Sequence, residues 1–256
     1  MTSFLNRLRT RLKRLWALPP DYNNAIKDVD PLVLEIYQQV RPYTMTNLLR
    51  VNALVQSVDH VIRRGIAGAF VECGVWRGGS VLAMLLRLQH LGVQDRDVHL
   101  YDNFEGMPAP AAADTSPYER PAFLTWQQAT AAGRRAWAQF FRPEIFTFEQ
   151  VRETVLATGY PASRIHFVKG DILETIPGTA PAQIALLRLD TDWYESTRHE
   201  LLHLYPRLNP GGVLLIDDYG HWDGCRKAVD EYFSTGGAAP VLLNRVDYAA
   251  RLAVKH

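Results

Sequence analysis

The sequence predicts an α/β fold in which helices cover both faces of a mostly parallel sheet. From about residue 66 onward, short apolar runs alternate with stretches of helical periodicity, which is the pattern of such sheets. The hydrophobic fraction of 47% and the charged fraction of 21% are typical of a globular protein. The 256 residues suffice for one large domain or two small ones.

The alternating region contains seven predicted strands. The helices and turns between them are marked by changes of periodicity and by Gly and Pro. The last two strands are separated by Asp247 alone and predict a terminal antiparallel hairpin. The predicted strands are 69–73, 98–102, 164–168, 184–190, 213–217, 241–246 and 248–254. The predicted helices are 80–90, 194–208 and 225–233, with a turn at 209–212.

Two stretches depart from this alternation. Residues 103–163 are rich in Pro, Ala and aromatic side chains, and they predict a lid or substrate wall inserted into the main domain, 66–256. Residues 1–65 form a separate N-terminal segment. Its first 20 residues carry five basic and no acidic side chains at amphipathic spacing. That pattern suits a helix packed on the body or on a dimer partner, a frayed terminus, or weak contact with a membrane surface.

The charge and cysteine counts exclude several protein classes. The net charge is +1, from 28 basic and 27 acidic residues, so nucleic acid is not expected as a partner. Two distant cysteines, Cys73 and Cys225, do not make a secreted disulfide scaffold or a thiolate zinc site. The apolar runs are too short to insert stably into a membrane, and no signal peptide is evident. A cytoplasmic protein is therefore expected.

A Gly-rich turn, Glu72 to Ser80, follows the first predicted strand. Its glycines, such as Gly74, allow the backbone to approach a ligand closely. The turn lacks the Lys of a P-loop and the G-x-G-x-x-G dinucleotide pattern. Acids also follow the next two strands: Asp102, which can bind ribose hydroxyls, and Asp171, which can meet an adenine amino group. Together these residues predict a nucleoside pocket with little provision for phosphate, although each acid alone fits an ordinary helix cap.

Four carboxylates follow the fourth and fifth strands. Asp190 and Asp192 end one apolar run, and Asp217 and Asp218 end the other. Parallel strands present their carboxyl ends at one sheet edge, so these acids should meet there. Like charges at close range raise one another's pKa unless a cation intervenes, and oxygen ligands suit Mg²⁺. Helix caps and surface turns are the structural alternative.

Four segments in order resemble the macrocin O-methyltransferase family, over roughly residues 40 to 254. They are 70–80, 102–108, 187–197 and 216–220. The resemblance implies the seven-stranded class I methyltransferase fold, S-adenosylmethionine, Mg²⁺ and a hydroxyl acceptor, often on a sugar. It also implies metal ligands at Asp190, Asp217 and Asp218, a general base at Asp192, and an N-terminal segment that closes over the cofactor. The expected cofactor-binding residues are Tyr43, Thr44, Met45, Glu72, Gly74, Ser80, Asp102, Asp171 and Asp190.

The chemistry of methyl transfer agrees with these assignments. A sugar hydroxyl is a poor acid, so a metal ion and a nearby base help to remove its proton. Asp192 is the first candidate for the base. His221 is the second, because a histidine titrates near neutral pH. His199 and His203 are four residues apart on a predicted helix, and we assign them to its surface.

The function expected from the sequence is O-methylation of a sugar or glycosylated small molecule, or an oligosaccharide. The alternatives are a catechol-type methyltransferase and a non-catalytic scaffold that binds S-adenosylmethionine. The basic amphipathic N-terminus makes a homodimer a reasonable expectation. Residues 1–20 and much of 109–147 match none of the family segments, so we expect acceptor specificity to lie there.

Overall fold

The computed structural model describes residues 28–235 and 238–256. Strands and helices alternate along the chain as predicted. The strands are β1 (Ala69–Cys73), β2 (Val98–Asp102), β3 (Ile165–Lys169), β4 (Ile184–Leu189), β5 (Leu208–Ile216), β6 (Asn244–Arg245) and β7 (Arg251–Val254). The helices are α2 (Pro31–Val40), α3 (Leu48–Arg63), α4 (Gly79–His90), α5 (Ala122–Ala131), α6 (Ala138–Phe141), α7 (Phe148–Leu156), α8 (Ile172–Thr175), α9 (Tyr194–Leu204) and α10 (Asp223–Thr235). Short 3₁₀ helices are η2 (Arg41–Tyr43), η3 (Ala162–Arg164) and η4 (Tyr205–Arg207).

The strands form one seven-stranded sheet in the order β3-β2-β1-β4-β5-β7-β6. The first five are parallel, and β7 is antiparallel to both β5 and β6. This confirms the predicted fold class, including the terminal hairpin. Because β1 and β4 are neighbours, the chain leaves the sheet centre in opposite directions, and a crevice opens at the carboxyl ends of these strands.

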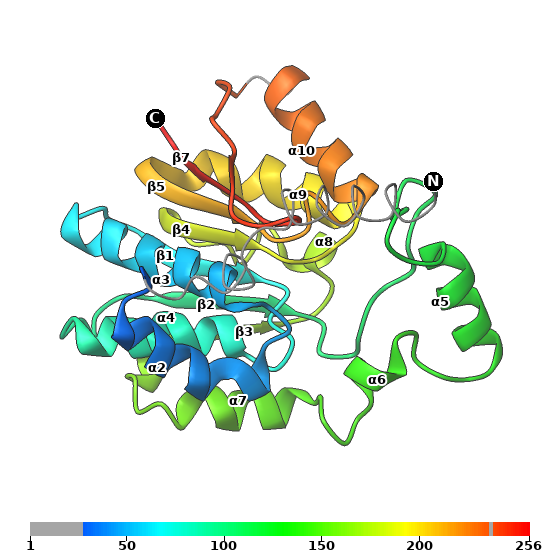
Figure 1. Ribbon diagram of the computed structural model, residues 1–256, viewed down its shortest axis with the longest axis horizontal. Coiled ribbons are helices and arrows are strands. Elements are labelled where there is room, and N and C mark those ends of the chain that lie inside the picture. Colours follow the sequence, from blue (N-terminus) through cyan, green and yellow to red (C-terminus); the bar gives the residue numbers. More distant parts are fainter. Residues whose placement is uncertain (1–27, 236–237) are drawn as a thin grey trace, which may run out of the picture.

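Helices cover both faces of the sheet, as Figure 1 shows. Helices α2, α3, α4 and α7 pack on one face, and α8, α9 and α10 lie on the other. The central strands β1 and β4 are consequently buried along their whole length, which explains their nearly unbroken apolar sequences. None of the helices within residues 28–235 and 238–256 has the length and apolarity that crossing a membrane requires.

The stretch between β2 and β3 contains two different parts. Helix α7 buries Val151 and Val155 in the same core as α4, so it serves as the crossover helix between these strands. Helices α5 and α6 instead lie beyond the end of the sheet, shown in green in Figure 1. We call residues 103–147, which precede α7, the insertion. The basic segment predicted over residues 1–20 lies outside the described residues.

The predicted turn at 209–212 is wrong, because these residues belong to β5. Gly211 has a φ of +81°, and its N–H donates to the carbonyl of Lys255 at 2.7 Å. The glycines therefore make an irregularity inside a paired strand, visible as a register shift against β4. Glycine and proline indicate a break in regular structure, but they occur both in turns and in bulges within strands. The sequence pattern therefore could not distinguish the two.

The terminal hairpin is also shorter than predicted. Residues 246–250 form a turn in which the carboxylate of Asp247 accepts hydrogen bonds from the N–H groups of Ala249 and Ala250, at 2.9 and 2.7 Å. Such bonds from an aspartate to its own backbone favour a turn over a strand. Helix α9 ends at Leu204, ahead of Pro206, and η4 completes the stretch predicted as helix.

Candidate active site

A cavity of about 750 Å³ lies at the carboxyl ends of the parallel strands. Every residue that the sequence analysis proposed for the site lines it. The cofactor-side residues are Tyr43, Thr44, Met45, Glu72, Gly74, Ser80, Asp102 and Asp171. The acids and the histidine are Asp190, Asp192, Asp217, Asp218 and His221. Their position is thus established, whereas their individual roles remain predictions.

Asp190, Asp217 and Asp218 meet as the sequence predicts. One carboxylate oxygen from each lies within 4.8 Å of the others. The N–H of Asp190 donates to Cys73 O and that of Asp217 to Leu189 O, both at 2.9 Å, so the strand pairing continues into these residues and sets their position. Asp218 Oδ2 is buried without a hydrogen-bond partner among the described residues.

Two arginines that the sequence analysis did not assign lie among these acids. Arg188 is 3% exposed, and its guanidinium pairs with Glu72, with Asp190 at 2.8 Å and with Asp217 at 2.7 Å. Arg50, from α3, pairs with Asp217 and with Asp247. A single charge within the apolar strand β4 was the available signal for Arg188, since such a residue is buried only when paired. No local pattern marks Arg50.

The remaining acids lack such a partner. Burial, together with repulsion from neighbouring carboxylates, raises the pKa of Asp218 and of Asp192 well above the usual range. Burial also raises the pKa of Asp190 to about 6, although Arg188 opposes the shift. A buried oxygen without a donor and a set of hard oxygen ligands are the features that a divalent ion would satisfy. The residues present therefore fit a Mg²⁺ ion.

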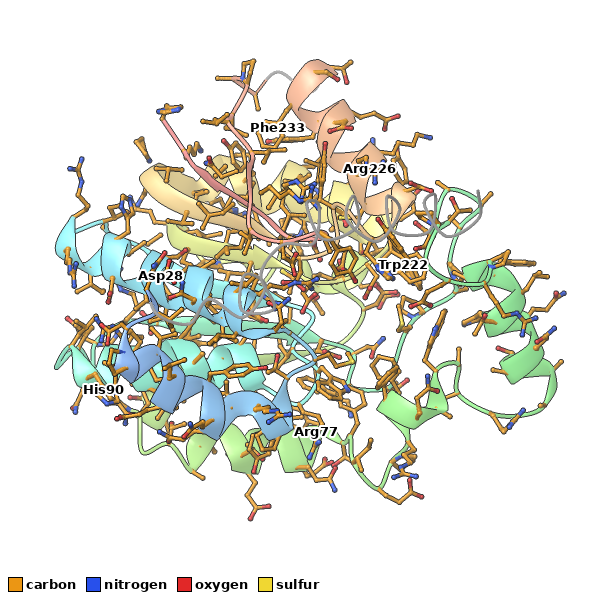
Figure 2. All side chains as sticks on the ribbon, viewed as in Figure 1. Asp28, Arg77, His90, Trp222, Arg226 and Phe233 are labelled. Atoms are coloured by element: carbon orange, nitrogen blue, oxygen red, sulfur yellow. The ribbon has the colours of Figure 1, made fainter. Side chains whose placement is uncertain are left out.

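Asp192 is held in a constrained loop after β4. Its φ of +68° is in the left-handed region, which costs energy for a residue other than glycine. The indole N–H of Trp222 donates to Asp192 Oδ1 at 2.8 Å. The neighbouring Thr191 hydroxyl donates to Glu200, a fully buried acid of α9, at 2.8 Å. Figure 2 labels Trp222 at the end of the sheet nearest the insertion. Asp192 is thus fixed from two sides.

His221 lines the cavity beside residues of the insertion and of the terminal turn. Its Nε2 is 3.3 Å from Glu119 Oε1, and its Nδ1 is 3.1 Å from the hydroxyl of Tyr248. Glu119 belongs to the insertion, which therefore contributes directly to the site. The sequence analysis assigned the insertion to this role but identified none of its residues.

The cofactor side of the cavity is built around Asp102. Its carboxylate accepts hydrogen bonds from the N–H groups of Val75, Trp76 and Phe104, at 2.8, 2.9 and 2.6 Å. These bonds shape the Gly-rich turn. Oδ2 accepts two of them and Oδ1 one, so the free acceptor position of the carboxylate is on Oδ1. Asp171 accepts a bond from Leu173 N and caps α8. Both carboxylates thus have a structural role in addition to the predicted contacts with a nucleoside.

Two glycines of the turn are required by close packing. A side chain at Gly74 would collide with the carbonyl of Asp190, and one at Gly79 would meet Tyr43 O and Thr44 Cβ at 2.5 Å. The segment at Tyr43 and Thr44 therefore lies directly on the N-terminus of α4. This close packing explains why the position requires glycine.

His199 and His203 are half-buried, and the prediction that they lie on the helix surface was only partly right. The two ring centroids are 4.4 Å apart, and His199 Nε2 is 2.9 Å from Ile176 O. Within residues 28–235 and 238–256, the one group of three or more metal-ligating side chains is the aspartate group described above. The pair therefore packs against the loop after α8.

Comparison with known proteins gives concordant matches. The macrocin-O-methyltransferase (TylF) family matches residues 38–252. The chain is 37% identical over 205 residues to 8-demethyl-8-(2,3-dimethoxy-alpha-L-rhamnosyl)-tetracenomycin-C 4'-O-methyltransferase of Streptomyces olivaceus, covering 80% of this chain and 73% of the relative. It is 34% identical over 191 residues to demethyldecarbamoylnovobiocin O-methyltransferase of Streptomyces niveus, covering 74% and 67%. The structure of the O-methyltransferase NovP superposes with a TM-score of 0.69 at 30% identity, covering 83% and 82%.

Proposed function

Since this chain belongs to the macrocin-O-methyltransferase family, we propose that it methylates a sugar hydroxyl of a glycosylated small molecule with the help of Mg²⁺. That it is an S-adenosylmethionine-dependent O-methyltransferase follows from the family and its relatives. The observation that carries the proposal is a single cavity containing both the Gly-rich turn with Asp102 and the group Asp190, Asp217 and Asp218. One of the relatives acts on a rhamnosyl group.

The donor side of the reaction is assigned to the first three strand ends. S-adenosylmethionine supplies a methyl group on a sulfonium centre, which reacts by in-line displacement. We expect Asp102 to accept hydrogen bonds from the ribose hydroxyls and Asp171 to face the adenine. Tyr43, Thr44 and Met45 would close the pocket from the α4 side and exclude water.

The acceptor side is assigned to the aspartates. Asp190, Asp217 and Asp218 would hold Mg²⁺, which supplies a positive charge that lowers the pKa of an adjacent hydroxyl. Arg188 and Arg50 neutralise part of the negative charge and keep Asp190 and Asp217 in position. The negative charge in excess of these arginines is what retains a cation in this proposal.

We propose Asp192 as the general base. It would take the hydroxyl proton as the carbon–oxygen bond forms and the carbon–sulfur bond breaks, with that electron pair passing to sulfur. It lines the cavity two residues after Asp190, at the same sheet edge as the proposed metal ligands. Its hydrogen bond from Trp222 fixes its orientation. His221 is the weaker candidate, because Glu119 and Tyr248 already contact both of its ring nitrogens.

The charge of the cavity favours a neutral glycoside over a sugar attached to a nucleoside diphosphate. Ten of the lining residues are Asp or Glu, whereas Arg50 is the only Lys or Arg among the described residues that line it. Arg50 is already paired with Asp217 and Asp247. A diphosphate would add negative charge to this environment without a basic partner. We therefore place the reaction after glycosyl transfer.

A methylation assay with purified protein tests this function. The probes are a panel of neutral 4-nitrophenyl glycosides starting with the α-L-rhamnoside, a nucleoside diphosphate sugar, and catechol, each with S-adenosylmethionine and Mg²⁺. We expect methylation of a neutral glycoside, at least tenfold lower kcat/KM on the charged sugar and on catechol, and loss of turnover in EDTA. Faster methylation of catechol or of the charged sugar contradicts the acceptor, and full turnover in EDTA contradicts the metal.

The same assay decides between the two candidate bases. We expect Asp192→Asn to lower kcat by about 10²- to 10⁴-fold, as loss of a general base does, while His221→Gln mainly raises the KM for the glycoside. The opposite pattern would assign the base to His221. Circular dichroism and S-adenosylhomocysteine binding show whether each variant is folded.

We also propose that the protein works in the cytoplasm as a dimer, and that residues 1–65 are an N-terminal helical segment and cofactor lid for the methyltransferase domain 66–256. The support is the charge pattern of the sequence and the basic, amphipathic spacing of residues 1–20, which lie outside the described residues. Light scattering on the full chain and on a chain lacking residues 1–20 tests the association. A monomeric full chain contradicts the dimer.

A further inference from the structure

We propose that three clustered aromatic side chains, two of which line the cavity, bind the aglycone of the acceptor, and that they select a flat, apolar one. The residues are Tyr118, His221 and Tyr248, and we call them the aromatic rim. The proposal rests on the proposed function, because it assigns the part of the glycoside that is not methylated. It identifies a binding surface next to the reacting groups.

The rim is a compact cluster contributed by three segments distant in sequence. The rings of Tyr118 and His221 stack at 5.7 Å with an interplanar angle of 19°. Tyr248 meets Tyr118 edge-on at 5.4 Å and His221 edge-on at 5.9 Å. Nevertheless, Tyr118 is 62% exposed and Tyr248 is 45% exposed. A large part of each tyrosine therefore faces solvent instead of completing a core.

The position of the rim follows from the order of the strands. Asp102 and Asp171 follow β2 and β3 on one side of the sheet, and His221 and Tyr248 lie beside β5 and β7 on the other. The aspartate group lies between them, at the ends of β4 and β5. A sugar hydroxyl at the aspartates is thus flanked by the cofactor pocket on one side and by the rim on the other.

Direct contacts connect the rim to the aspartates. The N–H of His221 donates to Asp218 O at 2.9 Å. The guanidinium carbon of Arg50 lies 5.7 Å from the centroid of the Tyr248 ring, while the same guanidinium pairs with Asp217. Only one side chain therefore separates Tyr248 from a proposed metal ligand. A substituent on the reacting sugar is within reach of the rim.

The insertion is anchored in a way that fixes Tyr118. Asp114 is 2% exposed, and its carboxylate accepts bonds from Tyr194 N at 2.8 Å and from Ala111 N at 2.6 Å. A side chain at Gly224 would collide with that carboxylate. Thr115 O also accepts a bond from Asp223 N at 2.8 Å. The residues preceding Tyr118 are thus attached to the starts of α9 and α10, and the rim is a built surface.

The chemistry of the rim specifies its ligand. Tyrosine rings offer rigid apolar area at a low cost in side-chain entropy, and they pair best with another flat ring. Glu119, beside His221, disfavours a negatively charged aglycone. Trp222, labelled in Figure 2, packs edge-on against His221 at 4.9 Å and supports it from the protein side. An uncharged aryl group is therefore the expected occupant.

Calorimetry with matched glycosides tests the proposal. The probes are the 4-nitrophenyl and methyl α-glycosides of the same sugar, for each sugar of the panel, titrated into the full chain with S-adenosylhomocysteine and Mg²⁺ present. We expect tighter binding of the aryl glycoside, and a reduction of that preference by about fivefold in Tyr118→Ala, the size of one aromatic contact. Tyr118→Phe should recover most of the preference. Phe123→Ala removes another exposed aromatic of the insertion, one that, unlike Tyr118, does not pack on His221 or Tyr248. It should leave the aryl preference unaltered.

The outcomes separate the rim from the proposed function. An aryl preference that depends on Tyr118, without methylation of any glycoside, would support the rim and contradict the activity on sugars. If both glycosides are methylated and the aryl glycoside does not bind more tightly, the proposed role of the rim is contradicted while the activity stands. The same holds if the aryl preference is unchanged in Tyr118→Ala. If no glycoside of the panel binds, the rim is overturned as well.

Discussion

Two groups of buried carboxylates share the carboxyl ends of the sheet, and they differ in how their charge is balanced. The paired carboxylates, Glu72 and Asp217, are bonded to Arg188 in the interior. The open carboxylates, Asp192 and Asp218, receive no arginine or lysine among the described residues, and Asp218 Oδ2 has no partner at all there. Asp190 lies at the boundary, bonded to Arg188 and close to Asp218.

The comparison shows how one sheet edge can be both stable and reactive. A guanidinium is part of the chain and stays charged, so the paired carboxylates are compensated at any metal concentration. The compensation is incomplete for Glu72, whose Oε2 has no partner among the described residues and whose pKa burial raises to about 8. Among the open carboxylates, Asp218 keeps an unsatisfied oxygen at the cavity, which an exchangeable ion can use. Arg188 therefore serves the fold, whereas the open carboxylates are available for chemistry.

Of the changes considered, replacing Arg188 should have the largest effect on the free energy of unfolding. Arg188→Met leaves Glu72 and Asp217 buried without their cation, and we expect the free energy of unfolding to fall by about 3 to 5 kcal/mol. Urea denaturation followed by circular dichroism measures it. Arg87→Met is the matched control, because Arg87 makes a two-pronged pair with Asp59 away from the cavity; it should lose stability but keep activity. An unchanged urea midpoint for Arg188→Met would show that the pairing is not needed for stability.

Metal addition should stabilise the protein through the proposed ligands, and Asp218 is the one open carboxylate among them. At a Mg²⁺ concentration one hundred times the dissociation constant, the free energy of unfolding should rise by about 2.7 kcal/mol. We expect Asp218→Asn to abolish most of this gain, whereas Asp95→Asn, at an exposed acid outside the cavity, should retain it. Thermal unfolding with and without Mg²⁺ provides the measurement. Equal stabilisation of both variants would place the ion elsewhere.

The pH dependence of stability in EDTA should show the same difference between paired and open carboxylates. The expected change in the free energy of unfolding is smaller. The pKa values of Asp192 and Asp218 are raised in the folded state, chiefly by burial, so the unfolded chain loses these protons first as the pH rises. Their contribution to stability is complete below the unfolded pKa of about 3.9 and is lost as the pH rises through the folded pKa, by no more than about 1.4 kcal/mol per pH unit and group. Asp218→Asn should flatten that decline relative to the unmodified chain. A decline of the same slope in both proteins would argue against buried, protonated open carboxylates.

The fold was largely predictable because its signals are local. Apolar runs such as that of β4 and helical spacing such as that of α4 are set by neighbouring residues. The errors arose where one local signal has two structural outcomes. Glycine at 211 produced a bulge instead of a turn, and Asp247 shortened the hairpin by bonding to its own backbone.

The site was predictable to the same degree for one physical reason. In a parallel sheet, residues that end neighbouring strands must meet at one edge, so the positions of Asp102, Asp190 and Asp217 follow from strand ends alone. The partners that set their charge follow from no such rule. Arg50 comes from a helix more than 150 residues away in sequence from Asp217, and Tyr118 reaches Tyr248 only through the path of the insertion.

The sequence by itself determined the order of the functional residues along the chain, which is a Gly-rich turn followed by acids at successive strand ends. The family resemblance indicated the reaction. The tertiary structure alone decided which of those acids are neutralised. The register of the sheet places Arg188 directly beside Glu72 on β1, and the insertion places Glu119 and Tyr118 over His221. Both depend on contacts between residues far apart in the chain, which cost loop-closure entropy and are settled only when the whole core packs.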